Sequence, residues 1–200
     1  MRAFFVIRGL VKPDSITMPN EPTKILVAVT GGVACFKAAA LVSQLAQQGH
    51  AVQVVMTPAA QAFVGTATFA ALTGQPVATE LFDSRWPLGA HIELARTHDV
   101  MCVAPATANF IGKVANGIGN DLLSTLYLCF TGPIMIAPAM NCEMWDKQAV
   151  QRNVKQLADD GVQIIDPGEG WLSCRTRGVG RMAEPDTISK HVNELISTNS

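Results

Sequence analysis

The stretch KILVAVTGGVACFKAAALVSQLAQQGHAVQVVM, residues 24–56, carries the pattern that decides the fold. After its first lysine it opens on a continuous apolar run, which is typical of a strand buried on both faces of a parallel sheet. A Thr-Gly-Gly turn and a helical apolar pattern over residues 33–48 follow, and Gly49 stands just past that pattern, where glycine commonly ends a helix. Residues 51–56 are apolar again. We therefore predict a strand, a helix and a second strand in succession.

The same alternation continues along the rest of the chain. We expect helices at residues 59–72, 108–128 with a break at 117–119, 147–160 and 185–196, and strands at 76–82, 99–104, 133–137 and, as the last short strand, 162–165. Strand-helix-strand units of this kind build a parallel sheet with right-handed crossovers. The predicted fold class is a single-domain α/β fold, a doubly wound (Rossmann or flavodoxin-like) parallel sheet with helices on both faces. Ligands of such folds bind at the carboxyl ends of the strands.

Residues 1–22 stand apart from this pattern. The apolar run at residues 1–7 is too short for the hydrophobic region of a secretory signal and lacks a small-residue cleavage site. Residues 12–22 are rich in Pro, Ser, Thr and Asn, and Met18 offers an alternative start. We expect residues 1–22 to be a disordered extension and residues 23–200 to form one domain.

The composition excludes several classes of protein. Hydrophobic residues make up 48% of the chain and charged residues only 16%, which favours an oligomer that hides apolar surface between subunits. A net charge of -1 without a basic run indicates no nucleic-acid partner. The longest apolar stretch, residues 126–140, is interrupted by Gly132 and Pro133, so we expect no membrane span. Five scattered cysteines without a C-x-x-C spacing predict a reducing, cytoplasmic compartment, with neither zinc nor a disulfide framework.

Three loops at the carboxyl ends of predicted strands combine small and polar residues. Gly31 and Gly32 open the first helix, where the backbone can approach a phosphate and the free N–H groups attract an anion. Thr57 puts a hydroxyl at the same edge, either in the site or as a helix cap. The loop PATAN at residues 105–109 can lie flat against a ring. Because neither G-x-G-x-x-G nor a P-loop is present, the three loops favour FMN over NAD or a triphosphate.

The segment PAMNCEMW, residues 138–145, follows the apolar run at 133–137. Pro138 removes a ladder donor and ends the strand. Asn141 then stands among two methionines and a tryptophan, a composition that suits a pocket for a flat, largely apolar ligand. From composition alone, a loop that closes the core with Met and Trp as filler is the commoner explanation.

The order of the residues is more specific than their composition. PAMNCEMW resembles the Pro-x-Met-Asn-x-x-Met-Trp signature of the flavin-containing cysteine decarboxylases, the family of phosphopantothenoylcysteine decarboxylase and the lantibiotic-processing decarboxylases. Four further segments resemble the family's phosphate loop, its His-Ile-x-Leu element, its flavin loop and the substrate clamp of its coenzyme A branch: TGGVACFK (30–37), HIEL (91–94), PATANF (105–110) and WLSCRTRGVGRM (171–182, here called the clamp segment). The resemblance covers the chain from residue 24 to about residue 188.

The resemblance implies FMN as cofactor and no metal. The residues implied to bind FMN are Gly31, Gly32, Val33, Thr57, Thr107, Ala108, Asn109, Phe110, Ala139 and Met140, and those implied to bind substrate are Asn141, Met144, Ser173 and Arg181. The chain departs from the family pattern at Phe110, where the flavin loop usually has threonine, and at Asn120, where an acid is common. Ser173 and Arg175 replace the small residues that flank the clamp cysteine.

The family's chemistry explains these residue types. A carboxylate on the α-carbon of a cysteine amide has no electron sink, whereas oxidation of the CH₂–SH group to a thioaldehyde supplies one, and a flavin can accept that hydride and return it. By resemblance, His91 assists thiol deprotonation or positions the reacting group, Asn141 binds the substrate carboxylate, and Cys174 protonates the enethiol carbon. A structural role at a helix start or an interface is the alternative for His91.

The resemblance implies a carboxy-lyase that converts 4′-phosphopantothenoylcysteine to 4′-phosphopantetheine in coenzyme A biosynthesis. It also implies a homotrimer or dodecamer with active sites between subunits. One alternative is a peptidyl-cysteine decarboxylase of the same family, which does not need Cys174. Another is a non-catalytic flavin-binding regulatory subunit, a class that typically carries a long acidic tail.

Overall fold

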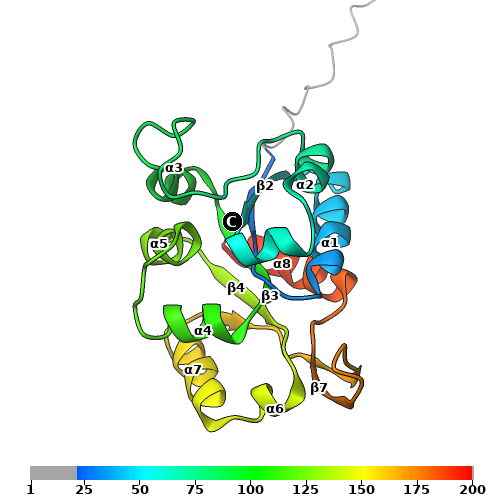
Figure 1. Cartoon of the computed structure of the whole chain (residues 1–200). Coiled ribbons are helices and arrows are strands. Elements are labelled where there is room, and N and C mark those ends of the chain that lie inside the picture. The colour runs from blue at the N-terminus through cyan, green and yellow to red at the C-terminus, as the bar shows by residue number, and fades with distance from the viewer. Residues whose placement is uncertain (1–21, 200) are drawn as a thin grey trace, which may run out of the picture.

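The computed structural model describes residues 22–199 (Figure 1). Apart from Pro22, the extension predicted at residues 1–22 lies outside this part of the chain. Five parallel strands form the central sheet in the order β2-β1-β3-β4-β5. They are β1 (Lys24–Val29), β2 (Ala51–Met56), β3 (Val100–Ala106), β4 (Ile134–Pro138) and β5 (Gln163–Ile164). This is the strand order of flavodoxin-like doubly wound sheets, so the predicted fold class is confirmed.

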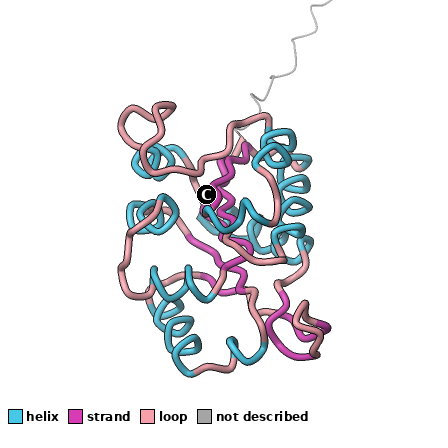
Figure 2. The backbone as a smooth tube through the Cα atoms, viewed as in Figure 1, coloured by secondary structure: helices cyan, strands magenta, loops and turns pink. Residues whose placement is uncertain are grey.

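Helices cover both faces of the sheet, as the ribbon and tube views show (Figures 1 and 2). Alternate residues of β1 face opposite ways: Ile25 and Val27 belong to one hydrophobic cluster, and Leu26 and Ala28 to the other. The first cluster is completed by side chains from α1 (Cys35–Gln47), α2 (Thr66–Thr73) and α8 (Pro185–Asn199). The second is completed by α3 (Ala90–Thr97), α4 (Ala108–Val114), α5 (Leu122–Cys129) and α7 (Gln148–Asp159).

Several predicted elements differ from the structure. Residues 76–82 form no strand, because only Ala78 pairs, in an isolated bridge with Val55. The helical region predicted at 59–72 is split into a 3₁₀ helix, η1 (Pro58–Ala62), and α2. The strand at 163–164 is not the last one, since the antiparallel pair β6 (Gly168–Trp171) and β7 (Arg177–Arg181) follows it. This hairpin and the short helices α3 and α6 (Cys142–Trp145) were not predicted.

The missed hairpin lacks the signal that identifies a buried strand. Most of its residues are exposed and its sequence is rich in glycine and arginine, so it shows neither an apolar run nor a clean alternation. It lies next to α6 and forms a small two-stranded sheet of its own (Figure 1). Among residues 22–199, no helix is both long and apolar enough to cross a membrane.

Candidate functional site

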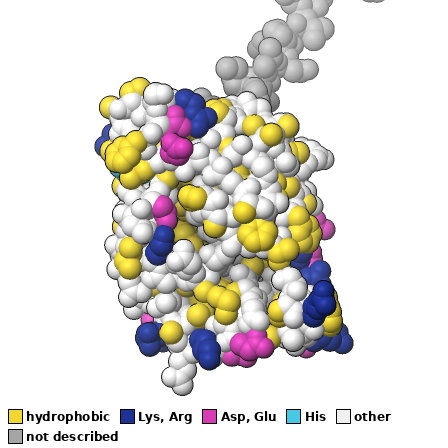
Figure 3. Space-filling view, in the orientation of Figure 1, with side chains coloured by type: hydrophobic (Ala, Val, Ile, Leu, Met, Phe, Trp, Pro, Cys, Tyr) yellow, Lys and Arg dark blue, Asp and Glu magenta, His cyan; other side chains and the backbone are white. Residues whose placement is uncertain are grey.

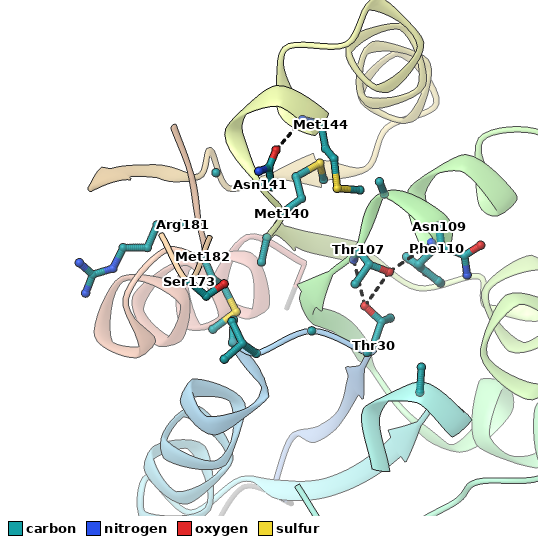
Figure 4. A pocket seen from close by; sticks show the side chains of 18 of the residues that line it. Thr30, Thr107, Asn109, Phe110, Met140, Asn141, Met144, Ser173, Arg181 and Met182 are labelled. Carbon is teal, nitrogen blue, oxygen red and sulfur yellow. Dashed lines mark hydrogen bonds between the residues drawn. The ribbon is translucent and has the colours of Figure 1, made fainter. Parts of the chain in front are cut away.

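A cavity of about 930 Å³ opens where the loops after β1, β3 and β4 meet η1 and the β6–β7 hairpin (Figure 4). Such a volume suits a drug-sized or cofactor-sized ligand. Nearly all predicted site residues line it: Gly31, Gly32, Val33, Thr57, Thr107, Ala108, Asn109, Phe110, Ala139, Met140, Asn141, Met144, Ser173, Cys174 and Arg181. His91 is the exception. The fold therefore brings together segments that are up to about 150 residues apart in the sequence.

The cavity is lined mainly by apolar groups. Hydrophobic side chains are frequent on the face of the molecule shown in Figure 3. Four of the large hydrophobic side chains that are exposed in this chain lie at the cavity: Val33, Phe36, Met144 and Trp171. An exposed apolar lining of this kind favours a ligand with a large apolar surface, a second protein chain, or both.

The first wall is the turn between β1 and α1. A Cβ atom on Gly31 would clash with Ala59 of η1, so this position requires glycine. No side chain caps the start of α1, whose N-cap residue is Ala34. The Cys35 and Lys37 N–H groups donate to the Gly32 and Ala34 carbonyls. The remaining N–H groups of this turn and the positive end of the helix dipole can serve an anion such as a phosphate.

The second wall is held by a pair of threonines that join two loops (Figure 4). The Thr30 hydroxyl donates to the Pro105 carbonyl (2.7 Å) and accepts from the Thr107 N–H (2.9 Å). The Thr107 hydroxyl lies 3.2 Å from that of Thr30 and caps α4 by accepting from the Phe110 N–H (3.4 Å). Thr30 was not among the predicted residues, although a hydroxyl between a buried strand and Gly31 was a usable signal.

Phe110 contributes to the core as well as to the site. Its ring is 3% exposed and packs edge-on against Tyr127, with ring centroids 6.0 Å apart and planes at 85°. The aromatic ring therefore stabilises the contact between α4 and α5, whereas the Phe110 N–H takes part in the capping of the loop. A phenylalanine at this position is compatible with the cavity.

The third wall is the loop after β4. Asn141 is the N-cap of α6, because its Oδ1 accepts a hydrogen bond from the Met144 N–H (3.1 Å). The side-chain amide N–H groups of Asn141 also lie within hydrogen-bonding reach of Glu143 and Cys174, and they can donate to a ligand in the cavity. The Met140 N–H donates to the carbonyl of Gly180 in β7 (2.9 Å), which fastens the hairpin to this loop. Gly180 has φ +145°, and a Cβ atom there would clash with the Met140 carbonyl.

Cys174 lies exposed in the turn between β6 and β7, at the edge of the cavity. Its Sγ is 3.0 Å from the Thr176 hydroxyl. Hydrogen bonds from Thr176 and, to a smaller extent, Asn141 hold the pKa of the Cys174 thiol below its ordinary value. Thr176 is the largest cause of that lowering, and no arginine is among its causes. Asn141 and Cys174 are thus neighbours at the cavity.

His91 does not join them. It lies in the first turn of α3, outside the set of residues that line the cavity. Its Nδ1 atom is buried and has no hydrogen-bond partner within the described part of the chain. Of the three residues predicted to be catalytic, the single chain brings two together and leaves the third elsewhere.

The cationic side chains at the cavity, those of Lys37, Arg181 and Lys113, each form an ion pair with a carboxylate. Lys37, the last residue of the 30–37 segment, is 7% exposed and donates to the Met182 carbonyl (3.1 Å) and to Glu184 (2.9 Å). Arg181 also pairs with Glu184 (2.8 Å), and Figure 4 shows its guanidinium extending away from the cavity. Lys37 was not among the predicted site residues, and neither were Lys113 and Asp121, which form a second ion pair at the cavity.

Lys113 of α4 and Asp121, the N-cap of α5, form that second ion pair at the cavity, with Nζ and Oδ2 2.6 Å apart. Partial burial alone would raise the pKa of Asp121. Hydrogen bonds from Lys113 and from the N–H and hydroxyl of Ser124 outweigh burial and hold that pKa below its ordinary value. Asp121 is therefore a carboxylate at neutral pH and holds the Lys113 ammonium in place.

Residues 15–197 match the family model described as Flavoprotein. The chain belongs to this family. It is 48% identical over 167 residues to the coenzyme A biosynthesis bifunctional protein CoaBC of Bacillus subtilis, covering 83% of this chain and 41% of that protein. The CoaBC protein of Haemophilus influenzae is 40% identical over 174 residues, which cover 86% and 44%. The chain thus spans less than half of the length of these relatives.

Solved structures with the same fold include cysteine decarboxylases. A PPC decarboxylase variant complexed with pantothenoylaminoethenethiol superposes with a TM-score of 0.79 at 28% identity, covering 88% of this chain and all of that one. The FMN-dependent cysteine decarboxylase SpaF superposes with a TM-score of 0.76 at 32% identity, covering 87% and 97%. The resemblance inferred from the sequence motifs is therefore confirmed.

Proposed function

We propose that this chain is an FMN-dependent decarboxylase that converts 4′-phosphopantothenoylcysteine to 4′-phosphopantetheine in coenzyme A biosynthesis. One observation carries the proposal. A single cavity brings together the start of α1, which no side chain caps, the amide of Asn141, and the Cys174 thiol, whose pKa is lowered by its neighbours. The named activities of the CoaBC relatives and of the PPC decarboxylase structure support the same assignment.

The residues present fit FMN. The first turn of α1 offers N–H groups to a phosphate, with Gly31 and Gly32 leaving room for its approach. The Thr30–Thr107 pair and the loop with Ala139 and Met140 form two sides of an apolar cavity of about 930 Å³. When bound there, FMN supplies a reversible hydride acceptor.

The chain's own residues supply binding and proton transfer. Asn141 uses its Oδ1 for the cap of α6, and its NH₂ group, which also reaches Cys174 and Glu143, donates to the substrate carboxylate. Loss of CO₂ leaves an enethiolate, and the Cys174 thiol gives its proton to the carbon that must become saturated. Ser173, Arg181 and Met144 line the cavity beside these two groups and form the substrate side of the site.

We propose further that His91 acts on the cavity of another copy of the chain in a homotrimer or dodecamer. Its absence from the cavity of its own chain and the exposed apolar residues at the cavity support this arrangement. Residues 23–200 then form one flavoprotein domain of a cytoplasmic enzyme whose site is completed by assembly.

Mixing two inactive variants tests the shared site. His91→Asn and Cys174→Ser should each fail to make saturated product. Co-refolded mixtures should regain activity, because some mixed oligomers contain one site with both wild-type residues. If His91 and Cys174 act from the same chain, no mixture recovers activity, and the shared-site proposal is wrong.

A substrate comparison tests the reaction. The purified protein, reconstituted with FMN, should release CO₂ from 4′-phosphopantothenoylcysteine and not from a peptide with a C-terminal cysteine. The Asn141→Asp variant should lose turnover because its carboxylate repels that of the substrate, while FMN stays bound. Decarboxylation of the peptide alone would favour the peptidyl-cysteine decarboxylase, and flavin binding with neither activity would favour the regulatory subunit.

A further inference from the structure

The thiols of Cys142 and Cys174 both lie within hydrogen-bonding distance of one hydroxyl group, that of Thr176. The Thr176 Oγ1 atom lies 3.0 Å from the Cys174 Sγ and 3.7 Å from the Cys142 Sγ. Cys174 comes from the turn between β6 and β7, and Cys142 from the first position of α6. Residues 32 positions apart thus place their sulfur atoms near a single hydroxyl oxygen.

Cys142 has no part in the proposed reaction. It follows Asn141 but does not line the cavity. Its Cβ packs so closely on β7 that a Cβ atom on Gly178 would lie 2.8 Å from it. The backbone at Cys142 is therefore held against the hairpin, and its Sγ lies 3.1 Å from that same position.

Cys174 is positioned to react. Its thiol is exposed, and the Thr176 hydroxyl lowers its pKa, which raises the thiolate fraction at neutral pH. Cys174 lies beside Arg175, whose φ of 66° marks a tight turn. Of the other cysteines, Cys35 and Cys102 are buried, and burial raises the pKa of the Cys102 thiol to about 12, whereas Cys129 is exposed at the end of α5.

We propose that Cys142 and Cys174 are an oxidation site that forms a reversible intramolecular disulfide with a small-molecule disulfide as oxidant. The Cys174 thiolate attacks one sulfur of the oxidant, forms a mixed disulfide and expels one thiolate. The Cys142 thiolate then attacks the Cys174 sulfur and expels the second. The two protein thiols lose two electrons and two protons, and the oxidant becomes two small thiols.

The bond has two consequences for the site. It fastens the turn of the hairpin to the start of α6, and it removes the thiol proton of Cys174. The loss of turnover that follows rests on the proposed function, whereas formation of the bond does not. The two can therefore fail separately: mass spectrometry reports the bond, and CO₂ release reports the reaction.

The test uses the full chain with bound FMN and glutathione disulfide as the probe. Trypsin cleaves after Lys and Arg, so Cys129 and Cys142 share the peptide 114–147, while Cys174 lies in the peptide 156–175. The experiment is therefore done in a Cys129→Ser background, with free thiols alkylated before digestion. We expect a product lighter by two hydrogens, a cross-link between the two peptides, and no increase in chain mass without reductant.

Two variants separate the steps. Cys142→Ser should retain its basal turnover but accumulate a stable glutathione adduct on Cys174, because the resolving thiol is missing. Thr176→Val keeps the shape of the side chain and removes the hydroxyl, so Cys174 should react more slowly at neutral pH. Wild-type turnover should fall in step with the cross-linked fraction and return with dithiothreitol.

Three results overturn the proposal. A stable glutathione adduct on wild-type Cys174 shows that Cys142 does not resolve it. A cross-link that joins two chains assigns the bond to an interface between copies. Alkylation of both thiols in full after incubation with the oxidant shows that neither thiol is an oxidation site.

Discussion

Replacing Gly180 by alanine should loosen the clamp segment from the loop after β4. Two effects add at this position. The φ of +145° is a conformation that only glycine adopts readily, and imposing it on alanine costs roughly 1–3 kcal/mol. The new Cβ also collides with the Met140 carbonyl, so the hydrogen bond from the Met140 N–H to the Gly180 carbonyl is lost at about 0.5–1.5 kcal/mol. We expect a total of roughly 2–4 kcal/mol.

Gly161→Ala is the matched control. Gly161 also has a positive φ, +90°, but a Cβ atom there meets nothing within 4 Å. It therefore measures the cost of backbone conformation without the cost of close approach. Urea unfolding of both variants gives the free energy of unfolding, and brief trypsin digestion reports cleavage at Arg175 and Arg177, which are exposed in the hairpin.

The expected pattern is specific to the contact. Gly180→Ala should be cut faster in the hairpin than wild type and should bind substrate more weakly, whereas Gly161→Ala should only lower the free energy of unfolding. If both variants lose the same stability and Gly180→Ala is cleaved no faster than wild type, the backbone contact with Met140 does not hold the clamp segment.

Three further predictions concern paired groups at the site. Asp121→Ala removes a helix cap and should cost about 1 kcal/mol at neutral pH. Because the folded-state pKa of Asp121 is lowered, the stabilisation from its charge is present above its unfolded pKa and is lost as pH falls through the folded value, so the gap between variant and wild type in urea unfolding should narrow in acid. Thr176→Val should move the pH midpoint of Cys174 alkylation by iodoacetamide upward. An unchanged midpoint would show that the Thr176 hydroxyl does not lower the pKa of the Cys174 thiol. Lys37→Met leaves the carbonyl of buried Met182 without its donor and removes the ion pair with Glu184, and it should cost about 1–3 kcal/mol in unfolding, with partial recovery in Lys37→Arg.

The sequence predicted the strands of the central sheet better than it predicted the β6–β7 hairpin beside the cavity. The bounds of β1 and β2 agree with the prediction residue for residue, because a strand buried on both faces is a continuous apolar run that ends at a turn. Residues 76–82 contain a short apolar run, which predicted a strand, but only Ala78 pairs with the sheet, in an isolated bridge with Val55 of β2. The hairpin at 168–181 depends on contact with the Met140 loop, and no local periodicity encodes such a contact.

The site was predicted where motif and topology agree. Loops that follow parallel strands meet at one edge of the sheet, so Gly31, Thr107 and Met140 were expected together and lie together. Lys37 could not be placed, because its partner Glu184 is nearly 150 residues away. His91 was predicted from its motif alone, and the structure places it on α3, outside the cavity, so its catalytic role stays a prediction.

The attachment of the clamp segment through main-chain atoms bears on how this protein can be engineered. The Met140 N–H donates to the Gly180 carbonyl, and every non-proline residue at position 140 supplies such an N–H group. Side chains at 173–179 are mostly exposed and play no part in that hydrogen bond. Randomising the other positions while keeping Cys174, Gly178 and Gly180 should therefore yield libraries in which the hairpin stays attached and the accepted substrate varies. The sequence of the hairpin can therefore be varied while its main-chain attachment to residue 140 is kept.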